Sequence, residues 1–475
     1  MDRPTRGLLV ALVVTVLFVL VDCLMLKNDR YELAFLPLGL VVVWIFIKHD
    51  SWSLPLMALL TPFAINFDVV QGMQLSMPVE PLMVLFSLIF MFRTLLMRDY
   101  PVRVLRHPVT IALMVSVAWM AFTSATSQLP WVSVKYTIAR LWFVIPFFFA
   151  AVRSFQSMAA VRRFFVAYAI GLGVVVFITT AKTLGNFSDL QTLHRVMKPF
   201  YNDHTAYGCV IALMLPAAVH WLTGLSRSRV ERIAAVVLLA LLAVGLFFSY
   251  CRAAWISIVA AIGVWVLIRL GMKVKWMVLL FGIGVGAFFV YQNDVLYKLG
   301  KNKQDSSYDL AGQVKSISNI STDASNVERL NRWASAMRMW REHPITGTGP
   351  GTYQFIYGSY QKSYQLSTIS TNFGNLGNAH SEYIGPLAEQ GLPGVAIVVA
   401  LFMITFVSGV RVYRTSANRL VADTALAFTL SLFTYYVHGV FNNFLDTDKL
   451  SVPFWAFTAV VVAMDVWGEK KTDVA

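Results

Sequence analysis

Charged residues are scarce in this chain of 475 residues. Asp, Glu, Lys and Arg together make up 13% of it, whereas hydrophobic residues make up 57%. Soluble domains carry about 25% charged and about 45–50% apolar residues. The composition therefore excludes a water-soluble globular protein. It indicates a polytopic membrane protein in place of the roughly two to four soluble domains that the length alone would suggest.

Several chemical signatures are missing as well. The three cysteines, Cys23, Cys209 and Cys251, lie in or beside apolar runs and form neither a metal-ligand pair nor a disulfide framework. The sequence has no P-loop and no nucleophile elbow. No set of His, Cys or carboxylate residues has clear metal spacing. We expect no cofactor, and any catalysis should be metal-free or use an ion that the sequence does not reveal.

Long apolar runs are what the sequence does contain. A membrane helix needs ~20 mostly apolar residues, and about 12–14 runs qualify, which predicts an all-α transmembrane bundle. The first run is expected to be a retained helix, because no small-residue cleavage site follows it. The runs lie at 7–26, 31–47, 53–70, 80–96, 109–123, 136–152, 164–181, 206–223, 233–250, 253–270, 275–291, 391–410, 420–440 and 452–466.

The net charge of +14 has a specific meaning in such a chain. In a soluble protein it would suggest a nucleic-acid partner, which we do not expect here. In a membrane protein it suggests basic loops on the cytoplasmic side. With the N-terminus inside, alternating spans put most of the short-loop basic residues on that side. Both termini are then cytoplasmic, and the stretch 292–390 is one large outer loop.

Four parts follow from this topology. Within the outer loop, apolar residues spaced by three and four predict a helix from Val327 to His343, which Pro344 ends. Gly347, Gly349 and Gly351 then predict a tight turn. The parts are N-terminal spans (1–200), central spans that carry Arg252 (201–291), the large outer loop with short helices (292–390), and C-terminal spans with a cytoplasmic tail (391–475).

Arginines at the outer face are the first candidates for function. Arg252 lies between two apolar runs, where it either snorkels to headgroups or clamps an anion, because a guanidinium binds two phosphate oxygens at once. The predicted loop helix is either a solvated face or a phosphate-binding surface. Its Arg329 and Arg332 are three residues apart, so both can address one anion. Arg140, one turn inside a span, is a weaker phosphate candidate.

Histidines and acidic residues at the same face are the second group. His380 lies just before a span and is either a structural donor or a general base; Glu382, two residues on, cannot share its helical face. Asp203 and His204 lie at a helix start, and we interpret Asp203 as the N-cap. A polar turn is expected at another outer end, which contains His438, Asn442, Asn443, Asp446 and Asp448.

Three segments in order resemble the bacterial O-antigen ligase and O-antigen polymerase superfamily, over roughly residues 200–460. Residues 326–353, NVERLNRWASAMRMWREHPITGTGPGTY, resemble its large outer loop, and Arg329 fills the Arg-x-x-x-Trp position whereas Arg332 is extra. Residues 379–394, AHSEYIGPLAEQGLPG, resemble its His-(Asn/Ser/Gln)-x9-Gly-x-x-Gly motif. Residues 249–255, SYCRAAW, resemble its Ser-Arg-(Gly/Ala)-Ala-Trp segment. Residues 202–208 are a looser fourth match.

The resemblance implies a membrane glycosyltransferase of the GT-C type in the bacterial inner membrane, with its large loop in the periplasm. Such enzymes move a glycan from undecaprenyl pyrophosphate to an acceptor hydroxyl. By this resemblance Arg252 and Arg329, with Arg332, hold the pyrophosphate, and His380 is the general base of an inverting, metal-independent reaction. Accessory roles fall to His204, Arg140 and Asp446, of which Asp446 would orient the base or the acceptor.

Several activities remain open at this point. A ligase acting on lipid A-core is favoured slightly, because the outer basic residues suit an anionic acceptor. A polymerase that joins lipid-linked repeat units shares the donor chemistry, and a protein O-glycosyltransferase is a third enzyme. A lipid-linked glycan flippase belongs to a different class. Transporters usually show broken helices near mid-membrane, whereas the polar groups here gather at the outer face.

Overall fold

The computed structural model describes residues 36–48, 50–70, 73–185, 196–277, 324–366 and 377–468, scattered positions between 12 and 27, and residues 279 and 370. The chain divides into two units, Met1–Ser53 and Leu54–Ala475. The first unit contains helix α2 (Leu36–Lys48), and helix α3 (Asp50–Leu60) runs across the division. The remaining described elements belong to the second unit.

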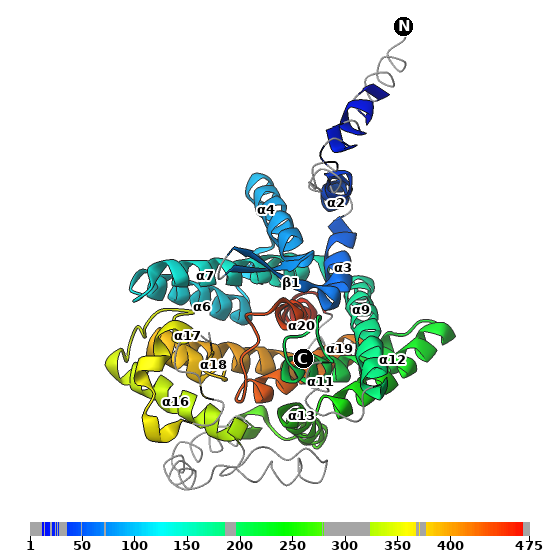
Figure 1. The fold of residues 1–475 in the computed structure, drawn as a ribbon. Coiled ribbons are helices and arrows are strands. Elements are labelled where there is room, and N and C mark those ends of the chain that lie inside the picture. The colour runs from blue at the N-terminus through cyan, green and yellow to red at the C-terminus, as the bar shows by residue number, and fades with distance from the viewer. Residues whose placement is uncertain are drawn as a thin grey trace. The chain divides into compact units, whose positions relative to one another are not determined.

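The second unit is a bundle of helices with one small β-hairpin (Figure 1). Among the described residues, ten helical segments are long and apolar enough to cross a membrane. They are Val79–Met97 (α4), Pro108–Ala125 (α6), Pro130–Ser154 (α7 Pro130–Val144, η3 Ile145–Ala150, α8 Ala151–Ser154), Met158–Gly185 (α9), His204–Leu225 (α11 His204–His220, η4 Trp221–Leu225), Arg229–Phe248 (α12), Arg252–Arg269 (α13), Ile384–Thr415 (α18), Arg419–His438 (α19) and Asp448–Trp467 (α20).

Shorter elements connect and cover these helices. Helix α16 (Ala324–Glu342) matches the helix predicted from Val327 to His343. The others are η2 (Thr61–Phe63), β1 (Ile65–Val70), β2 (Met73–Met77), α5 (Val102–Leu105), α17 (Tyr353–Ile356), η5 (Tyr357–Tyr360) and η6 (Ser363–Gln365).

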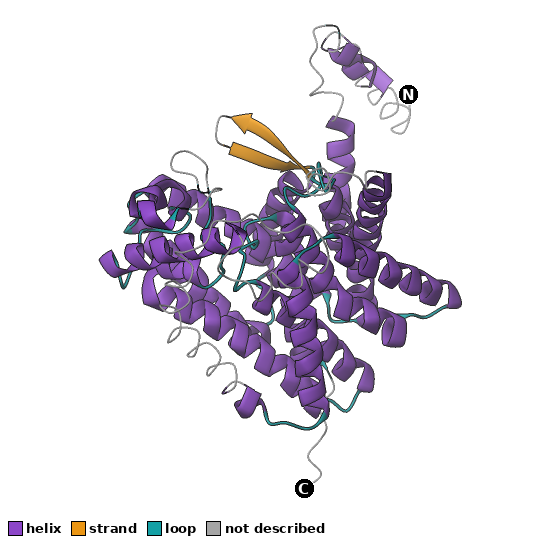
Figure 2. Ribbon diagram, turned by 60° about the horizontal axis from the view of Figure 1, so that its bottom comes forward, coloured by secondary structure: helices purple, strands orange, loops and turns teal. Residues whose placement is uncertain are grey.

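The predicted all-α class and the multi-pass membrane character are confirmed, and ten of the predicted runs coincide with the ten helical segments. The span predicted at 53–70 is wrong. This stretch ends α3, forms η2 at Pro62 and continues as β1, which pairs antiparallel with β2 (Figure 2). Proline removes a helical hydrogen bond, and hydropathy alone does not separate a strand from a helix.

Other predicted runs are tested only in part. The described portion of 31–47 is the 13-residue helix α2. Only scattered positions of run 7–26, and only residues 275–277 and 279 of run 275–291, are among the described residues. Within the described ranges, the β1–β2 hairpin is the only sheet.

Helices α19 and α20 form the centre of the bundle. Helix α19 contacts α11, α13, α18 and α20, and nearly every side chain of α20 is buried. Membrane helices associate through close packing because lipid tails are as apolar as their side chains. Gly409 illustrates this, because a Cβ there would lie 1.8 Å from Thr429 Oγ1 on α19. The packed centre fixes the helix ends on which the loops rest.

A kink in α18 receives the turn that follows α16. Gly391 has a φ of 70° inside the helix, and a Cβ there would lie 2.1 Å from the Ile345 carbonyl oxygen. The Leu392 N–H donates to the Pro344 carbonyl at 2.9 Å. The predicted glycine turn is also present, because Gly347, Gly349 and Gly351 all have positive φ. Glycine is required where the backbone is left-handed and approached this closely.

A partly buried polar cluster joins α6, α18 and α20. Asp465 of α20 accepts from His107 Nε2 at 2.8 Å and from the Arg411 guanidinium. His107 also caps α6, because its Nδ1 accepts from the Val109 N–H. The Nε2 atom therefore carries the proton that His107 donates to Asp465.

Candidate active site

Five segments that are far apart in sequence meet at one end of the bundle. They are the start of α11, the turn between α12 and α13, helix α16, the loop before α18, and the segment after α19. Contacts join α11 to α13, α13 to α19, α16 to α18, and α18 to α19. These segments carry the motif residues, so the fold brings the three family-like motifs to one place.

The Arg252 segment is a strained turn packed on α11. Tyr250 has a φ of 48°, and Ser249 Oγ accepts from the Cys251 N–H at 3.2 Å. Gly208 of α11 allows this approach, because a Cβ there would lie 2.7 Å from Cys251 Cβ. Arg252 is the first residue of α13 and is half-buried. The positive end of a helix dipole and a guanidinium therefore coincide, which favours an anion.

The start of α11 lies beside this turn. Asp203 Oδ1 accepts from the N–H groups of Thr205 at 2.7 Å and Ala206 at 2.8 Å, which confirms the predicted N-cap. The Cys251 thiol lies 3.9 Å from the Thr205 carbonyl oxygen. His204 is the first residue of α11 and is half-buried. Two helix N-termini, those of α11 and α13, thus lie side by side at this end.

Arg332 is buried and binds two other segments of the site. Its Nε donates to Glu328 Oε1 at 2.7 Å and its Nη1 to the Asn378 carbonyl at 3.0 Å. The guanidinium also lies 5.3 Å from the ring centre of Tyr357. Ser370 donates to the other oxygen of Glu328. Arg332 therefore ties α16 to the loop that carries His380.

Arg329 points to a different partner. Its Nε donates to the Phe441 carbonyl at 3.2 Å, in the segment after α19. The two arginines thus form separate contacts, although three residues separate them on one helix. Both guanidinium charges still act on His380, whose pKa they lower. Through their charges they form one positive region around His380.

His380 lies in a loop that several hydrogen bonds hold in place. Its φ is 49°, and its N–H donates to Asn378 Oδ1 at 3.1 Å. Next to it, the Glu382 N–H donates to the Gly439 carbonyl at 2.8 Å, and Ser381 Oγ accepts from the Ile384 N–H at 3.3 Å. A left-handed non-glycine residue costs free energy and is often found at functional sites.

The imidazole of His380 is neutral at neutral pH. Burial lowers its pKa first, and the charges of Arg332 and Arg329 lower it further, to about 3, against an opposing effect of Asp203. A neutral imidazole can accept a proton, whereas an imidazolium cannot. The site therefore holds His380 in the form that a general base requires.

Glu382 organises the segment after α19. Its Oε1 accepts from the N–H groups of Phe444 at 2.9 Å and Leu445 at 3.0 Å, and from the Tyr435 hydroxyl. The sequence offered no signal for this role, because the partners lie more than fifty residues away. Within the expected polar turn, His438 is buried and pairs with Asn442 at 3.1 Å.

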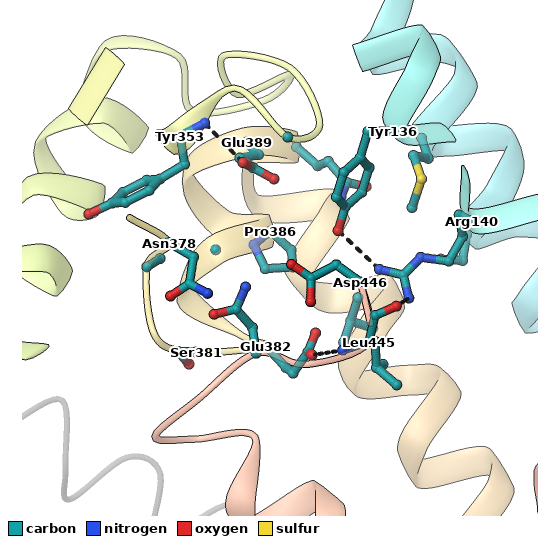
Figure 3. Close-up of a pocket in the computed structure, with 18 of the residues that line it drawn as sticks. Tyr136, Arg140, Tyr353, Asn378, Ser381, Glu382, Pro386, Glu389, Leu445 and Asp446 are labelled. Carbon is teal, nitrogen blue, oxygen red and sulfur yellow. Dashed lines mark hydrogen bonds between the residues drawn. The ribbon is translucent and has the colours of Figure 1, made fainter. Parts of the chain in front are cut away.

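A cavity of about 110 Å³ lies beside the His380 loop, and we call it the loop cavity. Figure 3 shows Arg140 and Asp446 in it, together with Tyr136, Glu382 and Glu389. Arg140 donates to the Leu445 carbonyl at 2.7 Å and to the Tyr136 hydroxyl at 3.0 Å. Arg140 and Asp446 thus line the loop cavity. The charges of Arg329 and Arg332, by contrast, lower the pKa of His380.

The acidic side chains of the loop cavity differ in their surroundings. Glu389 accepts from the Tyr353 N–H at 3.0 Å. Asp446 is exposed, but surrounding protein and the charge of Glu382 raise its pKa to about 6, against an opposing effect of Arg140. Within the ranges that the structure describes, no group of three or more His, Cys, Asp and Glu residues could hold a metal ion.

Comparison with known proteins adds one finding to this geometry. Residues 235–399 match a protein-family model described as O-antigen ligase. The matched region contains Arg252, Arg329, Arg332 and His380, whereas Arg140, His204 and Asp446 lie outside it. A search of the curated proteins found no match. The matched part of the chain is thus similar to the O-antigen ligase family, which supports a multi-pass membrane glycosyltransferase of ligase or polymerase type.

Proposed function

We propose that the protein transfers a glycan from undecaprenyl pyrophosphate to an acceptor hydroxyl, and that it is an O-antigen ligase acting on lipid A-core. The oxygen of the acceptor forms a bond to the anomeric carbon as the bond from that carbon to the pyrophosphate oxygen breaks. The electron pair leaves with the pyrophosphate, and the acceptor proton goes to His380. A single displacement of this kind inverts the anomeric centre.

The charge around His380 is the observation that carries this proposal. Arg329 and Arg332 act electrostatically on a neutral histidine, and Arg252 begins a helix at the same end of the bundle. A departing pyrophosphate needs its growing negative charge stabilised. Arg252 and Arg329 would supply that charge to the phosphates, and the N-termini of α11 and α13 would add to it.

The remaining site residues have supporting roles in this proposal. Arg332 would add positive charge and also position the His380 loop, because it already binds Glu328 and the Asn378 carbonyl. His204 lies next to Asp203 at the start of α11 and would be an accessory contact to the phosphates. Arg140 and Asp446 would act from the loop cavity, where Asp446 orients the base or the acceptor.

The proposal includes a location. The end of the bundle that carries the candidate active site would face the periplasm from the inner membrane. Both termini would be cytoplasmic. The division into spans 1–200, spans 201–291, loop 292–390 and spans 391–475 belongs to the same proposal. A polymerase that joins lipid-linked repeat units would use the same donor contacts and the same base, because only its acceptor differs.

A reconstituted transfer assay tests the function. Purified protein in vesicles receives undecaprenyl-pyrophosphate glycan, with and without lipid A-core. A ligase shifts the acceptor in one step by a whole glycan, whereas a polymerase makes a ladder of longer lipid-linked glycans without acceptor. Movement of lipid-linked glycan across the vesicle, with no product in either tube, would mean a flippase instead.

Variants connect the activity to the site. We expect His380→Ala and Arg252→Ala to abolish transfer while the protein still inserts and unfolds as the wild type does. Arg341→Ala is the matched control for the arginines, because Arg341 is exposed in the last turn of α16. Near wild-type transfer by both site variants would refute the assignment of His380 and Arg252.

A further inference from the structure

The loop cavity has an excess of acidic side chains. Glu382, Glu389 and Asp446 line it, whereas Arg140 is the one guanidinium among its lining residues. Arg140 already donates to Leu445 and Tyr136. Like charges repel strongly where little water screens them. The loop cavity therefore disfavours a phosphate or carboxylate, in contrast to the positive region formed by Arg329 and Arg332.

Two polar atoms around the loop cavity need partners. In the described part of the chain, Trp455 Nε1 and Asn443 Oδ1 are buried without a hydrogen-bond partner, and both residues line the cavity. Trp455 is only 3% exposed. Leaving such groups unpaired costs free energy, and a molecule in the cavity could supply the missing bonds once the two side chains turn toward it, because neither atom is open to the cavity in this structure. One group is a donor and the other an acceptor, and a hydroxyl group can satisfy both.

The remaining walls suit a sugar ring. Val398, Leu401 and Phe402 provide an apolar side, and Asp446 is exposed, so a ligand can reach its carboxylate. A carboxylate is a strong acceptor for sugar hydroxyls. The space can hold several waters, since about 10–15 Å³ is enough for one, and hydroxyl groups can replace them.

We propose that the loop cavity binds an unphosphorylated, hydroxyl-bearing sugar, with Asp446 and Asn443 accepting its hydroxyl hydrogen bonds and Trp455 donating one. This inference rests on the proposed function. Asn378, Ala379 and Ser381 also line the cavity, whereas His380 itself does not, so a sugar held there lies beside the loop that carries His380. That sugar is either the terminal ring of the acceptor or a ring of the donor glycan. Any negative charge of that substrate lies outside the ring that the cavity holds.

Kinetics of Asp446→Asn distinguish these two sources. The near-isosteric amide removes the charge that accepts the hydroxyl bonds, so we expect the KM of one substrate to rise about ten- to a hundredfold. A rise for lipid A-core assigns the sugar to the acceptor, and a rise for the undecaprenyl-pyrophosphate glycan assigns it to the donor. If neither KM rises more than about twofold, the inference is wrong. Asp423→Asn is the control, because Asp423 pairs with Arg419 near the other end of α19.

A binding measurement separates this inference from the proposed function. The full chain with His380→Ala is placed in nanodiscs, and its unfolding temperature is measured with delipidated acceptor oligosaccharide or delipidated donor glycan. We expect one of the two to raise the unfolding temperature, and a phosphate on its terminal ring to reduce that rise. Adding Asp446→Asn should abolish it.

Other results contradict the inference specifically. It fails if the phosphorylated sugar stabilises the protein as well as the unphosphorylated one, or if Asp446→Asn retains the full stabilisation. If the sugar-binding inference fails but the wild type still transfers glycan, the proposed function stands. Absence of transfer by the wild type would instead overturn the proposed function, whatever the sugar binding shows.

Discussion

Arg332 Nη1 donates to the backbone carbonyl of Asn378 at 3.0 Å, two residues before His380. The same guanidinium pairs with the buried Glu328 at 2.7 Å. One side chain thus connects the charged helix α16 to the loop of the proposed base. The electrostatics and the position of His380 consequently depend on the same residue, and this relationship can be tested.

Arg332→Ala should lower both stability and transfer. It leaves the Glu328 carboxylate buried with its main partner removed, which typically costs about 3–5 kcal/mol of unfolding free energy. It also frees the His380 loop. We therefore expect the factor by which kcat falls to be larger than the factor by which the KM for the donor changes. Unfolding in detergent and steady-state transfer measure the two effects, and Arg332→Lys should restore part of the stability. A variant as stable as Arg341→Ala would contradict the role of the ion pair.

The pH dependence should differ between the free and the donor-bound protein. Protonation of His380 removes its ability to accept a proton, and its pKa in the free protein is about 3. The acid limb of kcat/KM, which reports the free enzyme, should therefore lie well below pH 6. The pyrophosphate counters the charges of Arg329 and Arg332, so the acid limb of kcat should lie at higher pH. Coincident limbs near pH 6.5 would contradict this.

Stability should also follow the titration of His380. Its folded pKa lies below the ordinary value of 6.5, so the unfolded chain binds the proton first as the pH falls. Stability is unaffected by this group above pH 6.5 and is lost between pH 6.5 and 3, by up to about 1.4 kcal/mol per pH unit. Unfolding of His380→Asn across this range should show a weaker dependence than the wild type.

Gly391→Ala should destabilise the kink in α18. The alanine would have to adopt a φ of 70°, and its Cβ would lie 2.1 Å from the Ile345 carbonyl oxygen. With a ψ of −171° this is a conformation that essentially only glycine adopts, so it costs another residue about 1–3 kcal/mol, and the clash would displace the 343–347 turn. Gly263→Ala in α13 is the matched control, because nothing lies within 4 Å of a Cβ there. The control should be neutral or slightly more stable, since alanine favours helices over glycine by about 1 kcal/mol.

Asp465→Ala should separate stability from activity. It leaves His107 without its acceptor and removes the ion pair with Arg411, whose side chain is half exposed, so the protein should lose about 1–3 kcal/mol of unfolding free energy. Asp465 lies in the last turn of α20, whereas the 439–447 segment of the candidate site precedes that helix. We expect kcat per folded molecule to stay close to that of the wild type. A large loss of kcat with unchanged unfolding would place Asp465 in the reaction.

The sequence by itself determined the ten membrane helices, the α16 helix and the Asp203 cap. Membrane helices must satisfy their backbone hydrogen bonds within one segment, so the length and hydropathy of a run are enough to predict them. A cap depends on neighbours within three residues, and the glycine turn is local in the same way. The candidate residues Arg252, Arg329 and His380 came from motif order, which is also contained in the chain.

Tertiary structure alone decided what those residues contact. The hairpin at 65–77 was missed because strand pairing depends on a partner segment, which hydropathy does not record. Arg329 contacts the Phe441 carbonyl and Arg332 the Asn378 carbonyl, and the spacing of the two arginines in the sequence indicates neither contact. The role of Glu382 requires a contact with Leu445, 63 residues away. Such long-range contacts, and the cavity that they enclose, arise from packing of helix ends and leave no periodic pattern in the sequence.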